Sequence, residues 1–86
     1  MRNNILLINN KYFGMGLNRI DIAILSHIEE RERDRCKCYT TNEKLSEMFG
    51  ESVEDIELAI NRLEDMNLIK IDTRFKRALS LNHKYI

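Results

Sequence analysis

A glycine and a serine two residues apart divide two helix-forming segments, and this break restricts the possible folds of the chain more than any other feature. Before the break, Leu45 and Phe49 recur at helical spacing, and Gly50 can end a helix in the left-handed conformation. After it, Ser52 and Asp55 form a capping signature, so a new helix begins at once. The sequence therefore predicts two helices joined by a tight turn.

Another helix is predicted earlier in the chain. Asn18 can cap its first turn, and Asp21 lies three residues on, where a carboxylate favours the positive end of a helix.

Either Thr41, or Thr40 together with Glu43, can start the helix that follows. The apolar rows predicted to face the core are Ile20, Ala23, Ile24, His27 and Ile28 in the first helix, Leu45, Met48 and Phe49 in the second, and Ile56, Ala59, Ile60, Leu63 and Met66 in the third, which spans Ser52 to Met66.

Two runs of alternating apolar and polar residues, 68–73 and 78–81, predict a β-hairpin near the end of the chain. Asn67 precedes the hairpin at the position where a left-handed residue would end the third helix. The hairpin tip, Arg74 to Arg77, is basic and contains one phenylalanine. The segment 36–40 alternates in a similar way and predicts a short strand.

The whole chain is predicted to form one domain over residues 1–86, because no repeat or low-complexity linker divides it. Residues 4–13 are predicted to be extended, and a glycine-containing break separates them from the first helix. We therefore expect an extended arm over residues 1–16 and a folded core over residues 17–81. The predicted fold class is mainly α with a small β component.

Length and composition exclude several classes of function. A chain of 86 residues buries only about 60% of the surface that its unfolded form exposes, so a catalytic pocket would compete with the core for residues. The histidines are isolated and no glycine-rich phosphate loop is present, so we expect neither an enzyme nor a bound cofactor. The apolar runs are too short to span a bilayer and no secretory signal is visible, which predicts a cytoplasmic protein without membrane contact.

The two cysteines are separated by one residue. A disulfide between Cys36 and Cys38 would strain a short loop. Together with His27 and His83, the two thiols do not match a recognised spacing of metal ligands. The sequence therefore predicts reduced thiols and no metal site.

The helix pair and the hairpin share a residue pattern with a known family of domains. The pattern comprises Thr41, Leu45, Met48, Phe49, Gly50, Ser52, Ile56, Ala59, Ile60, Leu63, Met66, Asn67, Leu68 and Ile69. It resembles the winged helix-turn-helix of bacterial, phage and plasmid regulators and replication initiators, and the resemblance extends from Leu17 to Leu81. It implies a DNA-binding transcriptional regulator or a replication accessory factor of phage or plasmid type. The resemblance also implies that helix 52–66 would enter the major groove of DNA and that the hairpin tip would touch phosphate or the minor groove.

Charge is distributed unevenly along the chain although the net charge is zero. Residues 41–66 carry two basic and eight acidic side chains, whereas residues 67–86 carry five basic and one acidic. The basic residues between positions 31 and 37 alternate with acidic ones, so their net effect is small. Phosphate contacts are therefore predicted for four residues of the C-terminal part, Arg74, Lys76, Arg77 and Lys84.

The predicted outer face of helix 52–66 is unusual for a helix that reads a DNA groove. It presents acids that phosphate chains would repel, which disfavours deep insertion. Asn61 and Arg62 are the side chains on it that we expect to read bases. An outward leucine among these acids favours an alternative function, a protein-interaction module that docks on a basic partner in a replication or transcription complex. The residues predicted for that surface are Glu54, Glu57, Leu58 and Asp65.

The small number of cations bears on the expected partners. A single domain with so few basic residues would hold nucleic acid weakly at physiological salt. We therefore expect the chain to bind double-stranded DNA as a homodimer or together with a protein partner. The extended segment 4–13 is a candidate for the dimer contact.

Overall fold

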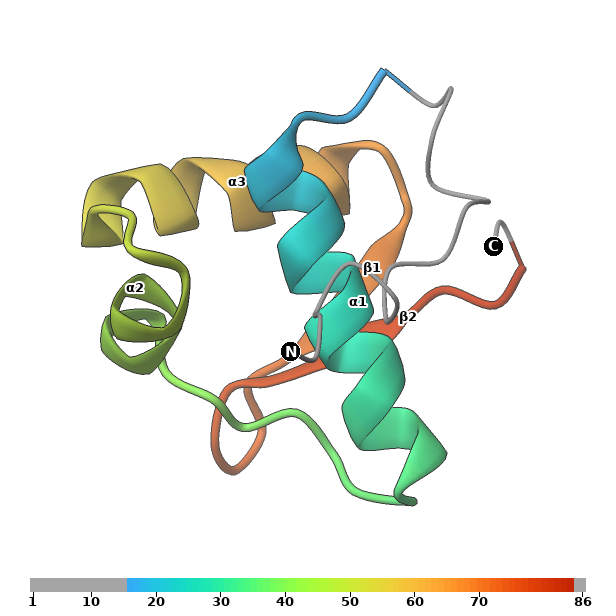
Figure 1. Ribbon diagram of the computed structural model, residues 1–86. Helices are drawn as coiled ribbons and strands as arrows, with labels where there is room; N and C mark the ends of the chain where they lie inside the picture. The colour runs from blue at the N-terminus through green and yellow to red at the C-terminus, as the bar shows by residue number, and fades with distance from the viewer. Residues whose placement is uncertain (1–15, 85–86) are drawn as a thin grey trace.

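The computed structural model describes residues 16–84, in which three helices precede a two-stranded antiparallel hairpin (Figure 1). In chain order the elements are α1 (Arg19–Arg33), α2 (Asn42–Phe49), α3 (Val53–Asp65), β1 (Ile69–Asp72) and β2 (Ala78–Leu81). This order confirms the mainly helical fold class and has a winged-helix-like topology, with the hairpin as the wing. The extended segment predicted at 4–13 lies outside the described residues.

The first helix packs against the other two helices and against the hairpin. In Figure 1, α1 runs down the middle of the view, α3 crosses behind its upper end and α2 lies to the left. The side chains of Ile24, Leu25 and Ile28 on α1 are completely buried and join one core with apolar residues of α2, α3 and the hairpin. None of the three described helices combines the length and the apolar character needed to cross a bilayer.

Side-chain caps determine where each helix begins. Asn18 Oδ1 accepts a hydrogen bond from the backbone N–H of Asp21 (2.9 Å), and the Asn18 N–H donates to the Asp21 carboxylate (3.1 Å). Thr41 and Ser52 each accept from the backbone N–H three residues on, which satisfies donors that the start of a helix leaves open. Gly50, with φ +67°, ends α2 in the left-handed conformation. The predicted caps and the tight turn between α2 and α3 are confirmed.

Burial differs from the predicted apolar rows at a few positions. Met66 is 40% exposed because α3 ends one residue earlier and Met66 is its C-cap. Met48 of α2 is also exposed, whereas Ile22 and Leu25 of α1 are buried in addition to the predicted residues. Asp21 is buried as well, although it is charged. The other predicted core residues of the three helices are buried or partly buried, so the rows were otherwise confirmed.

The hairpin forms as predicted, whereas the short strand predicted around Cys38 is reduced to a single bridge. β1 and β2 pair over all four residues of each strand. Next to them, the Leu79 N–H donates to the Cys38 carbonyl at 2.9 Å. A left-handed residue, Arg35 with φ +62°, precedes this bridge and the cap Thr41 follows it, which leaves little backbone for further pairing. Cys38 is buried, Cys36 is exposed, and both are free thiols.

His27 lies where α1 meets the segment that leads into α2. Its Nε2 atom is 2.8 Å from Oγ1 of Thr40, and its ring packs edge-on against Phe49 with the centroids 6.4 Å apart. Burial lowers the pKa of His27 from its ordinary value; Glu30 raises this pKa and Arg31 lowers it to smaller extents. The folded state therefore favours the neutral imidazole.

Acidification should destabilise the protein through His27. Because the pKa of His27 in the folded state lies below the ordinary value of 6.5, the unfolded chain takes up the proton first as the pH falls. The stability that depends on neutral His27 is present in full above pH 6.5 and is lost as the pH falls through the folded pKa. Urea denaturation between about pH 5 and 7.5 should show this loss in the wild type and not in His27→Gln.

The matched control for this experiment is His83→Gln, which leaves His27 in place and should retain the loss of stability. A His27→Gln variant that loses as much stability on acidification as the wild type would contradict the prediction.

Candidate nucleic-acid interface

The tip of the wing is shaped by Asp72 at the end of β1. Its carboxylate accepts hydrogen bonds from the Arg74 backbone N–H (2.9 Å) and from Nη2 of the same residue (2.9 Å). An Asp side chain that bonds to the backbone two residues on stabilises a tight turn. The side-chain hydrogen bond from Arg74 is the main cause that lowers the pKa of Asp72 to about 2. Asp72 is therefore ionised at neutral pH and partly offsets the charge of Arg74.

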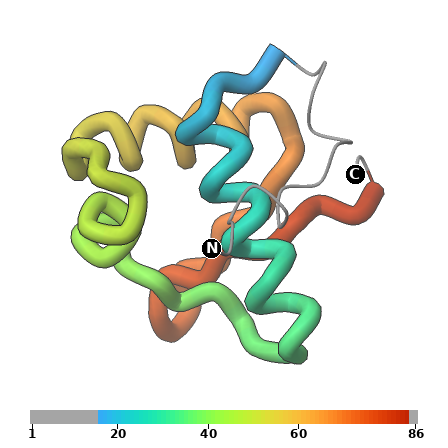
Figure 2. Tube along the Cα trace, in the orientation of Figure 1, coloured from blue at the N-terminus to red at the C-terminus, as the bar shows by residue number. Residues whose placement is uncertain are grey.

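An open hollow, called the wing groove below, lies between this tip and the segment that precedes α2. Figure 2 shows the two parts of the chain next to each other, residues 36–41 in green and the hairpin tip in orange-red. The groove has a volume of about 350 Å³ and is open to solvent. Its lining residues are Lys37, Tyr39, Asp72, Arg74, Phe75, Lys76 and Ala78.

Two aromatic rings of the wing groove are exposed to solvent. Phe75 at the tip is 84% exposed, and Tyr39 on the opposite wall is 42% exposed. The Lys76 ammonium lies 5.8 Å from the centroid of the Phe75 ring, a distance at which a cation and an aromatic face attract each other. The groove therefore combines positive charge with apolar rings that the core does not use.

Arg77 differs from the other cations of the wing because it is half-buried. Its guanidinium donates to the backbone carbonyl of Thr40 and to Oδ1 of Asn42, the first residue of α2. Burial lowers the pKa of Arg77, and the charge of Glu43 acts in the opposite direction. Arg77 thus joins the base of the wing to the start of α2, and the donors involved are already occupied.

A second hollow extends from the wing to α3. It has a volume of about 350 Å³ and is lined by Asn42, Glu57, Ile60, Asn61, Ile71 and Arg77. The structure therefore brings together Asn61 and Arg77, two residues that the sequence predicts to contact nucleic acid. Glu57 lies in the same hollow, so the positive character of the wing tip declines towards α3.

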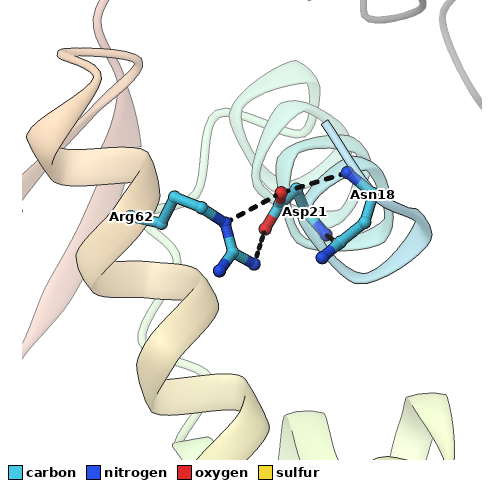
Figure 3. A network of polar contacts seen from close by, with 3 residues as sticks. All are labelled: Asn18, Asp21 and Arg62. Atoms are coloured by element: carbon cyan, nitrogen blue, oxygen red, sulfur yellow. Dashed lines mark hydrogen bonds and ion pairs between the residues drawn. The ribbon is translucent and has the colours of Figure 1, made fainter. Parts of the chain in front are cut away.

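Arg62 is directed at the start of α1. Its Nε and Nη2 atoms donate to the two carboxylate oxygens of Asp21 at 3.1 and 2.7 Å (Figure 3). The side chain of Asp21 is 1% exposed and also takes part in the cap with Asn18, whereas the side chain of Arg62 is 43% exposed. The hydrogen bond from Arg62 to Asp21 raises the pKa of Arg62. This pair ties α3 to α1 across 41 residues of sequence.

The outer face of α3 has the orientation expected from the helical wheel. Leu58 is 61% exposed, and Glu54, Glu57 and Asp65 are exposed on the same helix. Arg62 is the one basic residue of α3, and it is paired with Asp21. A phosphate chain that approached this face would therefore meet mainly carboxylates.

Lys84 lies away from the wing groove. It follows Asn82, whose backbone N–H donates to the Leu68 carbonyl at 2.9 Å, at the end of the hairpin opposite its tip. The structure therefore does not bring Lys84 together with Arg74 and Lys76, although the sequence groups the three.

Lys37 and Tyr39 are not among the site residues predicted from the sequence. Lys37 belongs to a run of alternating charges, but the chain turns at Arg35 and Lys37 then lines the wing groove. Tyr39 follows buried Cys38, so its outward orientation agrees with the alternation of side chains in an extended segment. That alternation is the signal that could have identified it.

Comparisons with protein-family models, with curated protein sequences and with solved structures found no match to this chain.

Proposed function

We propose that this protein is a winged-helix nucleic-acid-binding domain that acts in transcription regulation or DNA replication and holds nucleic acid on its wing. The wing groove is the observation that carries this proposal, because Lys37, Arg74 and Lys76 line one hollow with two exposed aromatic rings. Cations that contact phosphates release the counterions bound to nucleic acid, and this release supplies most of the non-specific affinity.

The position of the acids supports the wing, rather than α3, as the main contact surface. A phosphate chain near α3 would meet exposed Glu54 and Glu57, and carboxylates near phosphates oppose binding. On the wing, Asp72 is already paired with Arg74 at 2.9 Å. Asn61 is exposed and lines the hollow beside the wing, so it is the α3 side chain best placed to reach a base edge.

Two copies, or one copy and a protein partner, would be needed for tight binding. Three cations in the wing groove give only a small number of phosphate contacts, and few contacts release few counterions, so the affinity of one copy at physiological salt is low.

Binding of labelled duplex and single-stranded DNA at about 50 and 150 mM salt tests this proposal. Replacing both Lys37 and Lys76 by Glu should weaken binding by roughly tenfold or more and reduce the salt dependence by about one power of salt concentration per lost phosphate contact. The matched control is Lys44→Glu with Lys70→Glu, which changes the net charge equally at exposed positions outside the wing groove. Unchanged affinity in the Lys37/Lys76 variant would reject the proposal.

A substitution of Asp72 should raise the affinity for nucleic acid instead of lowering it. Asp72→Asn removes a negative charge from the wing groove and loosens its hold on the Arg74 guanidinium, while the amide oxygen can still accept the Arg74 backbone N–H. This variant should bind nucleic acid more tightly than the wild type, and weaker binding would count against contact at the wing groove.

A second candidate function is a protein-interaction module that uses the outer face of α3. The 61% exposure of Leu58 together with the exposed acids beside it favours this candidate, because carboxylates around an apolar side chain would complement a basic partner. A variant with Leu58→Lys and Glu54→Lys should lose the recovery of a basic partner in a pull-down. Equal recovery of partners by this variant and the wild type would remove the candidate.

A further inference from the structure

We infer that the wing groove binds unpaired bases of a single-stranded nucleic acid, with Tyr39 and Phe75 as the stacking surfaces. The inference rests on the proposed nucleic-acid function and specifies which form of nucleic acid the groove accepts. Three features carry it: the exposure of the two rings, the cations beside them, and the acids on α3.

The two rings are exposed in one hollow, where a planar apolar ligand could cover them. Phe75 is 84% exposed at the hairpin tip, so its ring gains little from the core. Every base has a flat π face, and stacking on aromatic side chains stabilises single strands without reading their sequence. Inside a duplex the bases are stacked on their neighbours, so the ring of Phe75 could reach a base face there only by unstacking two adjacent base pairs.

Cations line the same hollow as the rings, so one nucleotide can meet both. Lys76 holds its ammonium 5.8 Å from the Phe75 ring centroid, and Lys37 belongs to the opposite wall. A base stacked on Phe75 would therefore carry its phosphate close to positive charge. Proteins that bind single strands without sequence preference combine a cationic track with aromatic stacking surfaces in this way.

The distribution of charge favours one strand over two. Glu57 lines the second hollow between the wing and α3, and Glu54 and Asp65 are exposed on the same helix. A single strand needs only the cationic side of the wing. A duplex lying across the wing and α3 would bring phosphates to these carboxylates.

A fluorescence experiment can test the inference because the chain contains no tryptophan. Phe75→Trp introduces a single indole at an exposed position, where the substitution does not disturb the core. Binding of oligo(dT) or oligo(U) of about 12 nucleotides should quench this indole, and both strands should bind more tightly than a duplex of the same length. The two oligonucleotides distinguish single-stranded DNA from RNA.

Two further substitutions separate stacking from simple apolar contact. Phe75→Ala should weaken single-strand binding about tenfold, and Phe75→Leu, which is apolar but has no π face, should not restore it. Restoration by Leu, or a duplex that binds at least as tightly as the single strands, would overturn the stacking inference and leave the proposed nucleic-acid function in place. Failure of both forms to bind would overturn the inference and the proposed function together.

Discussion

Replacing Arg62 by Met is expected to lower the free energy of unfolding by about 2–3 kcal/mol. The substitution removes both hydrogen bonds to Asp21 and leaves a carboxylate that is 1% exposed without its counter-charge. Breaking a fully buried ion pair costs about 3–5 kcal/mol, and the smaller value is expected because the Arg62 side chain is 43% exposed. Urea denaturation at neutral pH measures the loss, and Met retains most of the apolar stem and the helix propensity of Arg.

Arg19→Met is the matched control for this prediction. Arg19 pairs with Glu51 at 2.8 Å, but its side chain is 83% exposed, so the loss should stay below about 1 kcal/mol. Adding Asp21→Asn to Arg62→Met should recover much of the stability, because the buried amide no longer requires a counter-charge. Equal losses for Arg19→Met and Arg62→Met would show that the Asp21–Arg62 pair does not hold α3 against α1.

Replacing Arg77 by Met is expected to cost about 1–3 kcal/mol of stability and to loosen the wing. The guanidinium of Arg77 bonds to the Thr40 carbonyl and to Asn42, so its removal leaves partly buried acceptors without a donor. The neighbouring bridge between Leu79 and Cys38 should weaken at the same time. Denaturation measures the first effect, and faster hydrogen exchange of the Leu79 N–H measures the second.

Arg74→Met provides the comparison, because it removes the same charge from a side chain that is 89% exposed. It should weaken nucleic-acid binding and leave the exchange of the Leu79 N–H unchanged. If Arg74→Met and Arg77→Met reduce stability equally, the separation of a structural arginine from a phosphate-binding one is wrong.

Basic residues that are grouped in the sequence do not form a single site in the structure. In the sequence, Arg74, Arg77 and Lys84 cannot be told apart because they carry the same charge in the same segment. In the structure, Arg74 is exposed at the tip, Arg77 is bonded to the start of α2, and Lys84 lies at the other end of the hairpin. Which of them can meet a phosphate depends on packing that the spacing of charges does not contain.

Helix starts, the α2–α3 turn and the hairpin tip are predictable from the sequence because each depends on contacts within a few residues. Asn18 bonds to the backbone three residues on, Gly50 adopts φ +67° by itself, and Asp72 bonds to the backbone two residues on. The acidic face of α3 is likewise predictable, since helical spacing alone sets which side chains of a helix share a face. The positive charge of the wing is predictable from the residues of the hairpin segment themselves.

Only the tertiary structure decides which side chains of different elements meet. It pairs Asp21 with Arg62 across 41 residues, and it places Lys37 and Tyr39 beside the wing tip to form the wing groove. Such contacts depend on the angles and distances at which whole elements pack in one core, and no short-range pattern specifies them. The sequence thus determines the helices, the hairpin and the charge of each, whereas packing determines which charges are neutralised inside the fold and which remain for a partner.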